Sequence, residues 1–178
     1  MTSEELTELL KSNSFELFNL PIEFQIDPTT LEAKYHSLQK QIHPDNFSVN
    51  RNEEKLLATS LSSKINDAYQ TLASPIKRAK LILELNGLKI NLAENNQLPE
   101  NFLIEQMETH ETIAEANDDI DKLDAIIYEL EQKKDHLIAQ IEEHFVNENL
   151  QIIVELIKQL SFYDKLILLV ENNIQNAL

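Results

Sequence analysis

The chain has 178 residues, 42% of them hydrophobic, which is enough to fold one large domain or two small ones. Its single glycine argues against phosphate-binding loops, dinucleotide fingerprints and most hairpin sheets. The absence of cysteine excludes disulfides, a thiolate nucleophile and sulfur ligands for zinc or an iron-sulfur cluster. These features predict an all-α protein without a cofactor of its own.

Charge is unevenly distributed along the chain, whose net charge is −16. Residues 1–90 carry 10 Lys/Arg and 12 Asp/Glu, whereas residues 91–178 carry 5 and 19, so we expect the two halves to meet different partners. An acidic chain opposes binding to nucleic acid. Because no apolar run reaches bilayer-spanning length and the first residues are acidic, we predict a cytoplasmic protein that does not enter a membrane.

Two short helices are predicted near the N-terminus. Thr2 or Ser3, with Glu5 after it, indicates the N-cap of the first helix. The segment FELFNLP at 15–21 is typical of a short second helix that ends at Pro21.

A longer amphipathic helix is predicted over residues 28–42, with Asp27 as its cap. Proline cannot continue a helix and forces the residue before it out of the helical conformation. The segment His43-Pro44-Asp45 is therefore expected to be presented at the helix end. The apolar residues of this helix recur at spacings of four, three and four: Leu31, Tyr35, Leu38 and Ile42.

A second long helix is predicted between a polar loop at 48–52 and Ser74-Pro75. Two amphipathic helices joined by a loop of this length should pack antiparallel. A further helix is expected over 75–86, with Gly87 as its left-handed C-terminal cap. The apolar side of the second long helix is formed by Leu57, Leu61, Ile65, Ala68 or Tyr69, and Leu72.

The segment LKINLAENNQL at 88–98 is interpreted as a linker. A helix should begin at Pro99 and run to about Ala116. Asn117 or Asp118 should then cap the next helix.

Two long helices complete the second half. The apolar residues of the first alternate by threes and fours, interrupted by Lys134, to about Phe145. After a turn at 147–149, a similar helix is predicted over 150–174. The short turn favours pairing of these helices within one three-helix bundle over an intermolecular coiled coil. The alternating residues of the first long helix are Ile120, Leu123, Ile127, Leu130, Leu137 and Ile141.

The setting of His43-Pro44-Asp45 is more informative than the tripeptide, which alone could be a surface turn. It follows a helix whose polar face is expected to carry Lys34 and Lys40, both solvated, and it precedes an antiparallel helix containing INDAYQTL. This arrangement resembles the J domain, the module with which co-chaperones engage heat-shock ATPases, and FELFNLP is similar to its short first helix.

The second half extends the resemblance. FLIEQMETHET at 102–112 is similar to a segment of the HscB family, the specialised J-proteins of iron-sulfur cluster assembly, and LSFYDKL at 160–166 is similar to that family's closing helix. The resemblance covers nearly the whole chain beyond residue 13. It implies an N-terminal extension (1–13), a J domain with the following connecting helix (14–87), a linker (88–98) and a scaffold-binding three-helix bundle (99–178).

The resemblance implies a co-chaperone with two partners and without enzymatic activity. One partner is a DnaK/HscA-class ATPase chaperone, whose ATP hydrolysis the protein would stimulate. The other is an IscU-type iron-sulfur scaffold protein, which it would deliver to the chaperone. Neither role requires a metal or cofactor held by this chain.

Two sets of site residues are carried over by motif. Asn46 departs from the family pattern, in which lysine usually follows the tripeptide, and Ser161 replaces a basic residue. The chaperone-binding set is His43, Pro44, Asp45, Lys34 and Lys40. The scaffold-binding set is an apolar patch with an acidic rim: Leu103, Ile104, Met107, Phe162, Glu108, Glu111 and Glu115.

The apolar patch has an alternative interpretation as ordinary bundle core. However, residues 102, 103 and 104 spread over about 200° of a helix, so at least one must face outward. Exposed apolar groups ringed by Glu would suit docking of a basic scaffold surface.

Other hypotheses stay open at this stage. The protein could be a J-protein for another client, or a structural adaptor that forms a coiled coil through residues 120–174. An enzyme with His43 and Asp45 as an acid–base pair is disfavoured because no nucleophile, glycine loop or cofactor motif accompanies them. Solvent exposure rather than metal ligation is expected for the remaining histidines: His36, His110, His136 and His144.

Overall fold

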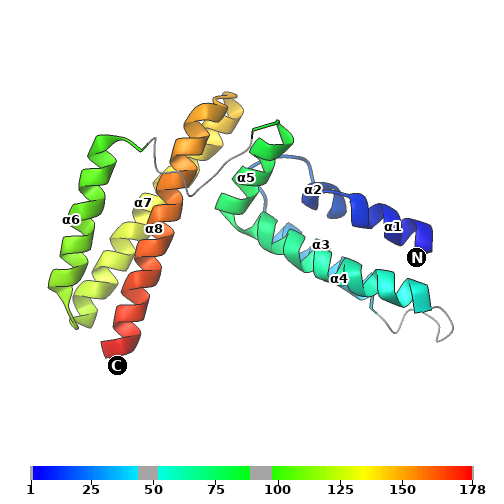
Figure 1. Ribbon diagram of the computed structural model, residues 1–178, viewed down its shortest axis with the longest axis horizontal. Coiled ribbons are helices and arrows are strands. Elements are labelled where there is room, and N and C mark those ends of the chain that lie inside the picture. The colour runs from blue at the N-terminus through cyan, green and yellow to red at the C-terminus, as the bar shows by residue number, and fades with distance from the viewer. Residues whose placement is uncertain (1, 44–51, 89–97, 178) are drawn as a thin grey trace. The chain divides into compact units, whose positions relative to one another are not determined.

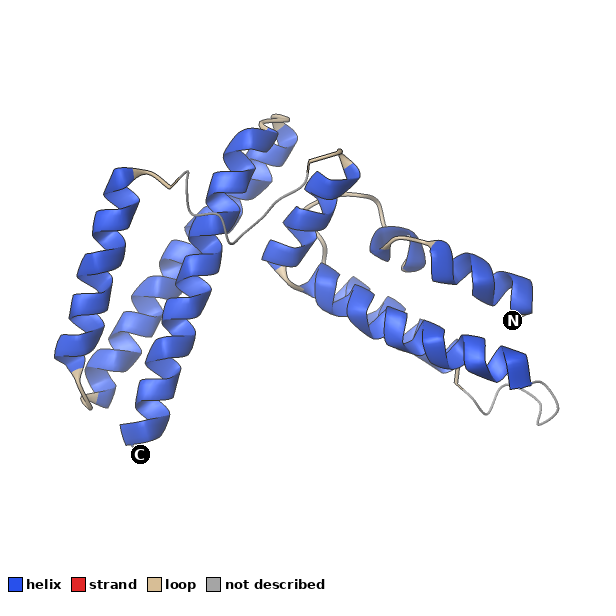
Figure 2. Cartoon of the chain, viewed as in Figure 1, coloured by secondary structure: helices blue, strands red, loops and turns tan. Residues whose placement is uncertain are grey.

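The computed structural model of the protein describes residues 2–43, 52–88 and 98–177. Within these ranges every regular element is a helix, so the all-α prediction is confirmed (Figure 2). The chain divides into two compact units, Met1–Ile82 and Leu83–Leu178. The helices are α1 (Ser3–Lys11), α2 (Ser14–Leu17), α3 (Pro28–Gln41), α4 (Asn52–Ala73), α5 (Pro75–Leu85), α6 (Glu100–Ala116), α7 (Ile120–Val146) and α8 (Leu150–Ala177), labelled in Figure 1.

Side chains near the helix starts satisfy backbone N–H groups that have no partner within the helix. The hydroxyl of Thr2 accepts from the backbone N–H of Glu5, while the Glu5 carboxylate accepts from the N–H of Thr2 at 2.8 Å. The Asp27 carboxylate accepts from the N–H of Thr30 at 2.9 Å at the start of α3. Both predicted caps are therefore confirmed.

The first unit is built on the hairpin of α3 and α4, which lie side by side (Figure 1). Asn66 on α4 joins the two helices, since its Oδ1 accepts from the Tyr35 hydroxyl at 2.9 Å and from Gln39 Nε2 at 2.7 Å. The hairpin core consists of Leu31, Ile42, Ala58, Leu61, Ile65, Ala68 and Leu72.

Helices α1 and α2 pack against α4 and close the first unit. Leu6 of α1 and Phe15 of α2 are both fully buried. Lys64 on α4 donates from Nζ to the carbonyl of Leu10 at 2.6 Å, at the C-terminal end of α1, where the helix dipole favours a cation. The segment expected to be an N-terminal extension thus contributes to the core of this unit.

The only glycine of the chain lies two residues beyond the end of helix α5. Gly87 has φ +82°, a left-handed conformation that costs a glycine little. The N–H of Leu88 reaches back to the carbonyl of Leu83 at 2.9 Å. The prediction of a left-handed cap at Gly87 is confirmed.

The second unit is a bundle in which α7 and α8 pack along most of their length. The prediction that these two helices find their partner within the chain is therefore confirmed. Helix α6 lies against this pair and buries Phe102, Ile113 and Ala116. The α7–α8 seam consists mainly of Leu123, Leu130, Leu137, Ile141, Ile153, Leu156, Ile157, Leu160, Leu166 and Val170.

The cap of α7 differs from the prediction. Asn117 adopts φ +49° and ends α6, so neither it nor Asp118 is placed at the N-cap of the next helix. Asp119 occupies that position, and its side chain accepts from the N–H of Lys122 at 3.2 Å.

Candidate functional site

The end of α3 places His43 at the surface. Ile42 follows the last helical residue, is only 2% exposed and donates its N–H to the carbonyl of Leu38 at 3.1 Å. His43 comes directly after this buried residue and is exposed. Pro44, Asp45 and Asn46 lie outside the described residues.

Lys34 and Lys40 do not share one face of α3. They are six positions apart in the helix, which places them about 120° apart around its axis. Lys40 is exposed, whereas Lys34 is half-buried and donates from Nζ to the carbonyl of Asn19 at 2.9 Å. The expectation that both lysines are solvated is therefore wrong for Lys34, because its ammonium binds the carbonyl of a residue that follows α2.

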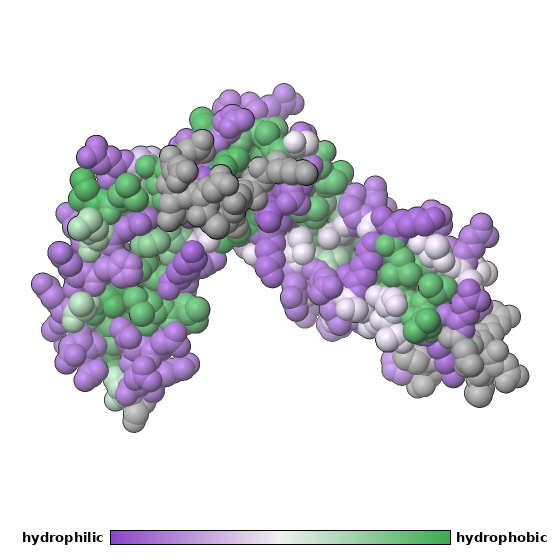
Figure 3. Space-filling model, in the orientation of Figure 1, coloured by the Kyte–Doolittle hydropathy of each residue, from purple (hydrophilic) through white to green (hydrophobic). Residues whose placement is uncertain are grey.

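Helix α6 presents apolar side chains to solvent. Leu103, Ile104 and Met107 are 44%, 52% and 66% exposed, whereas Phe102 is buried. The alternative that these three residues belong to the bundle core is therefore wrong. In the space-filling view, hydrophobic residues reach the surface among hydrophilic ones on the second unit (Figure 3).

The predicted acidic rim lies on the same side of α6. Glu108, Glu111 and Glu115 are all exposed. Glu108 is one turn beyond Ile104, and Glu111 is one turn beyond Met107, so the carboxylates adjoin the apolar residues along the helix. We refer to Leu103, Ile104, Met107 and these three glutamates as the outer face of α6.

Phe162 of α8 is half-buried beside α6. Its ring lies edge-on to Phe102, with centroids 5.7 Å apart, and to His110, with centroids 6.0 Å apart. His110 follows Met107 by three residues and Leu103 by seven, a helical spacing that could have placed it beside the patch. His110 is exposed, as expected from the sequence, but its contact with Phe162 was not expected.

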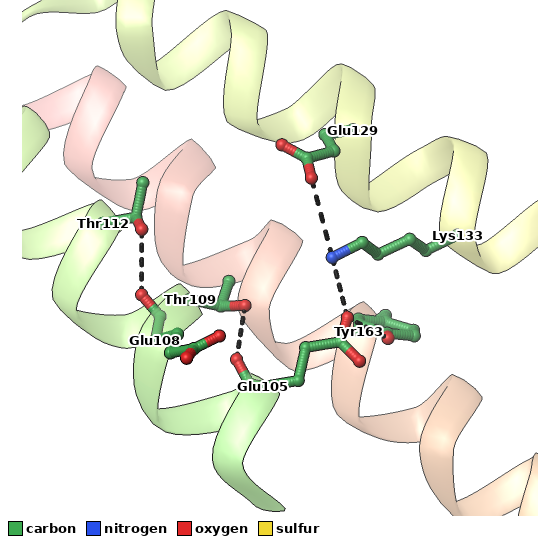
Figure 4. Close-up of polar contacts among 7 residues, drawn as sticks. All are labelled: Glu105, Glu108, Thr109, Thr112, Glu129, Lys133 and Tyr163. Carbon is green, nitrogen blue, oxygen red and sulfur yellow. Dashed lines mark hydrogen bonds and ion pairs between the residues drawn. The ribbon is translucent and has the colours of Figure 1, made fainter. Parts of the chain in front are cut away.

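A polar cluster joins all three helices behind the outer face (Figure 4). Oε1 of Glu105 on α6 accepts from Lys133 Nζ on α7 at 2.7 Å and from the Tyr163 hydroxyl on α8 at 2.9 Å. Lys133 also lies 3.6 Å from Glu129. We call Glu105, Lys133 and Tyr163 the clasp.

The clasp shifts the pKa values of its members. Burial acts to raise the pKa of Glu105, but the hydrogen bonds from Lys133 and Tyr163 and the charge of Lys133 outweigh it, so the net pKa lies below its ordinary value. Burial acts to lower the pKa of Lys133, yet Glu105 raises it overall. Burial, and then the bond to Glu105, raise the pKa of Tyr163. The charged Glu105–Lys133 pair is thus favoured by folding.

We expect Glu105→Gln to lower the unfolding free energy by about 1 kcal/mol at pH 7, discounted because the side chains are about one-third exposed. A carboxyl whose folded pKa is depressed stabilises above its unfolded pKa of about 4.3, and loses this effect as pH falls through the folded value. The difference in unfolding free energy between wild type and variant should therefore become smaller as the pH falls from 6 to 3. Urea unfolding across this range measures it, and a constant gap would contradict the assignment.

The remaining histidines show no sign of metal binding. His36 and His136 are exposed, as expected, whereas His144 is half-buried, contrary to its expected surface position. In residues 2–43, 52–88 and 98–177, no group of three His, Cys, Asp or Glu side chains is arranged to hold a metal ion. Across the same ranges, none of the helices combines the length and apolar character needed to span a bilayer.

Comparison with known proteins agrees with this geometry. A family model described as the HSCB C-terminal oligomerisation domain matches residues 98–170. The co-chaperone protein HscB homolog of Psychromonas ingrahamii is 43% identical over 155 residues, which cover 86% of this chain and 92% of that protein.

Solved structures are similar over almost the same extent. The chaperone HscB from Vibrio cholerae superposes with a TM-score of 0.82 at 33% identity, covering 94% of this chain and all of that one. The human co-chaperone protein HscB superposes with a TM-score of 0.85 at 26% identity, covering 91% and 82% of the two chains.

A helical hairpin that presents His43, together with a bundle that exposes an apolar helix face, defines a co-chaperone of the J-protein class. The chain belongs to the HscB family. The prediction of a co-chaperone of iron-sulfur cluster assembly, rather than an enzyme, is confirmed by these relatives.

Proposed function

We propose that the first unit stimulates ATP hydrolysis on a DnaK/HscA-class chaperone through His43, Pro44 and Asp45, while the outer face of α6 and Phe162 bind an IscU-type iron-sulfur scaffold. The observation that carries the proposal is the exposure of Leu103, Ile104 and Met107. They lie on a helix whose other side packs into the core of the bundle. Such a patch, with carboxylates beside it, is typical of a protein-binding surface.

The chemistry of the outer face selects its partner. Its apolar residues can fill pockets on the scaffold and lose water on binding. The carboxylates of Glu108, Glu111 and Glu115 adjoin them along the helix, so a basic surface on the scaffold is favoured and an acidic one is repelled. The net charge of −14 over residues 91–178 also attracts a basic partner at distances beyond the patch itself.

The chaperone-binding surface relies on a different sign of charge. His43 emerges from the end of α3, and Lys40 is exposed one turn earlier. Lys40 therefore supplies the accessible positive charge for an acidic chaperone surface, while Lys34 contributes mainly by holding α3 to the end of α2. This division of roles makes Lys40 the more important of the two for salt-sensitive docking.

Carrying both surfaces on one chain raises the local concentration of scaffold at the chaperone. Stimulation requires that the contacts of His43 favour a hydrolysis-competent state of the chaperone over its resting state. The protein then acts by bringing two partners together and by shifting a population, without catalytic groups of its own.

The decisive experiment measures the ATPase rate of a purified HscA-class chaperone with this protein, with and without the scaffold. We expect stimulation by the protein alone and further stimulation when scaffold is added. If this protein stimulates the ATPase equally with and without scaffold, and does not bind the scaffold, it would be a J-protein for another client. No stimulation and no scaffold binding, with self-association instead, would indicate a structural adaptor.

We also propose that the protein works in the cytoplasm, because its chaperone partner consumes ATP. Cell fractionation should recover it with cytoplasmic enzymes. Recovery with the cell envelope would contradict this location.

A further inference from the structure

Helix α6 is held to the bundle by few apolar contacts. Its buried residues are Phe102 at one end and Ile113 and Ala116 at the other. The segment between them carries Leu103, Ile104 and Met107 on its outer side, so those side chains contribute little to packing. Two contacts lie between these ends: the carboxylate of Glu105, which faces α7 and α8 (Figure 4), and the ring of His110, which lies against Phe162 of α8.

Clefts on both sides of the clasp show that side chains do not fill the space between α6 and α7. One cleft, of about 520 Å³, extends from Pro99 to Lys133 and His136. The other, of about 170 Å³, lies beside Thr109 and Ile126. Both are lined by the clasp residues Glu105 and Lys133. The clasp therefore crosses a region where apolar packing is incomplete.

We infer that Lys133 and Tyr163 are positioning residues for scaffold binding, which hold Glu105 and thereby keep the outer face of α6 in its binding geometry. The inference rests on the proposed function of that face. Glu105 is flanked in sequence by Ile104 and lies two residues before Met107, so a shift at Glu105 moves the apolar patch directly. Charged hydrogen bonds are directional, which suits them to setting the position of a helix.

The bundle contains a matched control. Lys134, the next residue on α7, forms an ion pair with Asp164 on α8 and makes no contact with Glu105 among the described interactions. Lys133 and Lys134 both link α7 to another helix and have similar exposure, 34% and 27%. Only Lys133 reaches α6, so the two positions separate an effect on α6 from a general loss of an ion pair.

The test measures the affinity of the full chain for purified scaffold protein by calorimetry. We expect Lys133→Met to weaken binding about fivefold and Tyr163→Phe about twofold. Lys133→Arg should bind like the wild type, since it can still donate to Glu105. Lys134→Met should also bind like the wild type. Equal affinities for Lys133→Met and the wild type, or equal losses for Lys133→Met and Lys134→Met, would overturn the inference.

A double-mutant cycle distinguishes positioning from a structural role. If the clasp acts through the outer face, Lys133→Met should weaken scaffold affinity less in a chain that already carries Met107→Ala than in the wild type. The reason is that Met107→Ala has already removed part of the surface that the clasp positions. Strictly additive losses would contradict the inference. A wild-type chain that fails to bind the scaffold at all would refute the proposed function instead, so the two failures are distinguishable.

Discussion

His43→Gln should abolish stimulation of the chaperone ATPase and leave the fold intact. The imidazole is exposed directly after the buried Ile42, so the substitution removes no core packing. Exposed positions away from the core change the unfolding free energy by about 0.5 kcal/mol or less. Glutamine lacks the ring and its two opposed nitrogens, so contacts shaped for an imidazole are lost. Steady-state ATPase rates at saturating co-chaperone measure the effect, and we expect them to fall to the basal rate.

His36→Gln is the matched control for this experiment. His36 is also exposed, lies on the same helix and is 3.6 Å from Glu32. The same substitution there should leave stimulation unchanged, because His36 lies about two turns of helix before His43. Wild-type stimulation by His43→Gln, or equal losses for the two variants, would remove the assignment of the segment. Scaffold affinity should be the same in both variants, since the second unit is untouched.

The largest effect on scaffold binding is expected for the combined substitution Leu103→Ala and Met107→Ala. If both side chains are anchors, each contributes about 1 kcal/mol or more, so together they should weaken binding by roughly thirtyfold. Both are at least 44% exposed, so the unfolding free energy should change little. Calorimetric titration with scaffold and urea unfolding of the same samples separate binding from stability.

The control for the double variant is Val146→Ala with Leu168→Ala. These residues are 79% and 57% exposed and lie on α7 and α8 rather than on α6. They remove a comparable amount of exposed apolar surface, and we expect no loss of scaffold affinity. Unchanged affinity in the Leu103/Met107 variant would mean that the scaffold binds elsewhere. Lowered stability with unchanged affinity would mean that both residues serve packing.

Local features of the chain were predictable because they depend on neighbouring residues. The caps at Thr2 and Asp27 follow from side chains that reach backbone groups two or three residues away. Gly87 caps the C-terminal end of α5 because this position favours a left-handed residue. The exit of His43 from the helix follows from the proline after it.

Contacts between distant segments were not predictable from one sequence. Lys34 looked like a solvated residue because nothing in α3 indicates that the carbonyl of Asn19 lies within reach. The clasp joins residues 28 and 58 positions apart, and no local pattern in the sequence singles out its members. Asp119 is the N-cap of α7 because Asn117 adopts a left-handed conformation. Asn117, Asp118 and Asp119 are all residue types that favour the N-cap, so the sequence does not distinguish between them.

By itself, the amino-acid sequence determined that the protein is helical, where its helices begin and end to within a few residues, and which motifs it carries. These properties depend on periodicity and on capping, which act over one or two turns. Only the tertiary structure decided which side of α6 faces water. Interactions within a helix do not depend on how the helix is rotated about its axis, so they do not select the side that is buried. The burial of Phe102 and the hydrogen bonds that Glu105 accepts select one rotation of α6 about its axis. In that rotation Leu103, Ile104 and Met107 face outward.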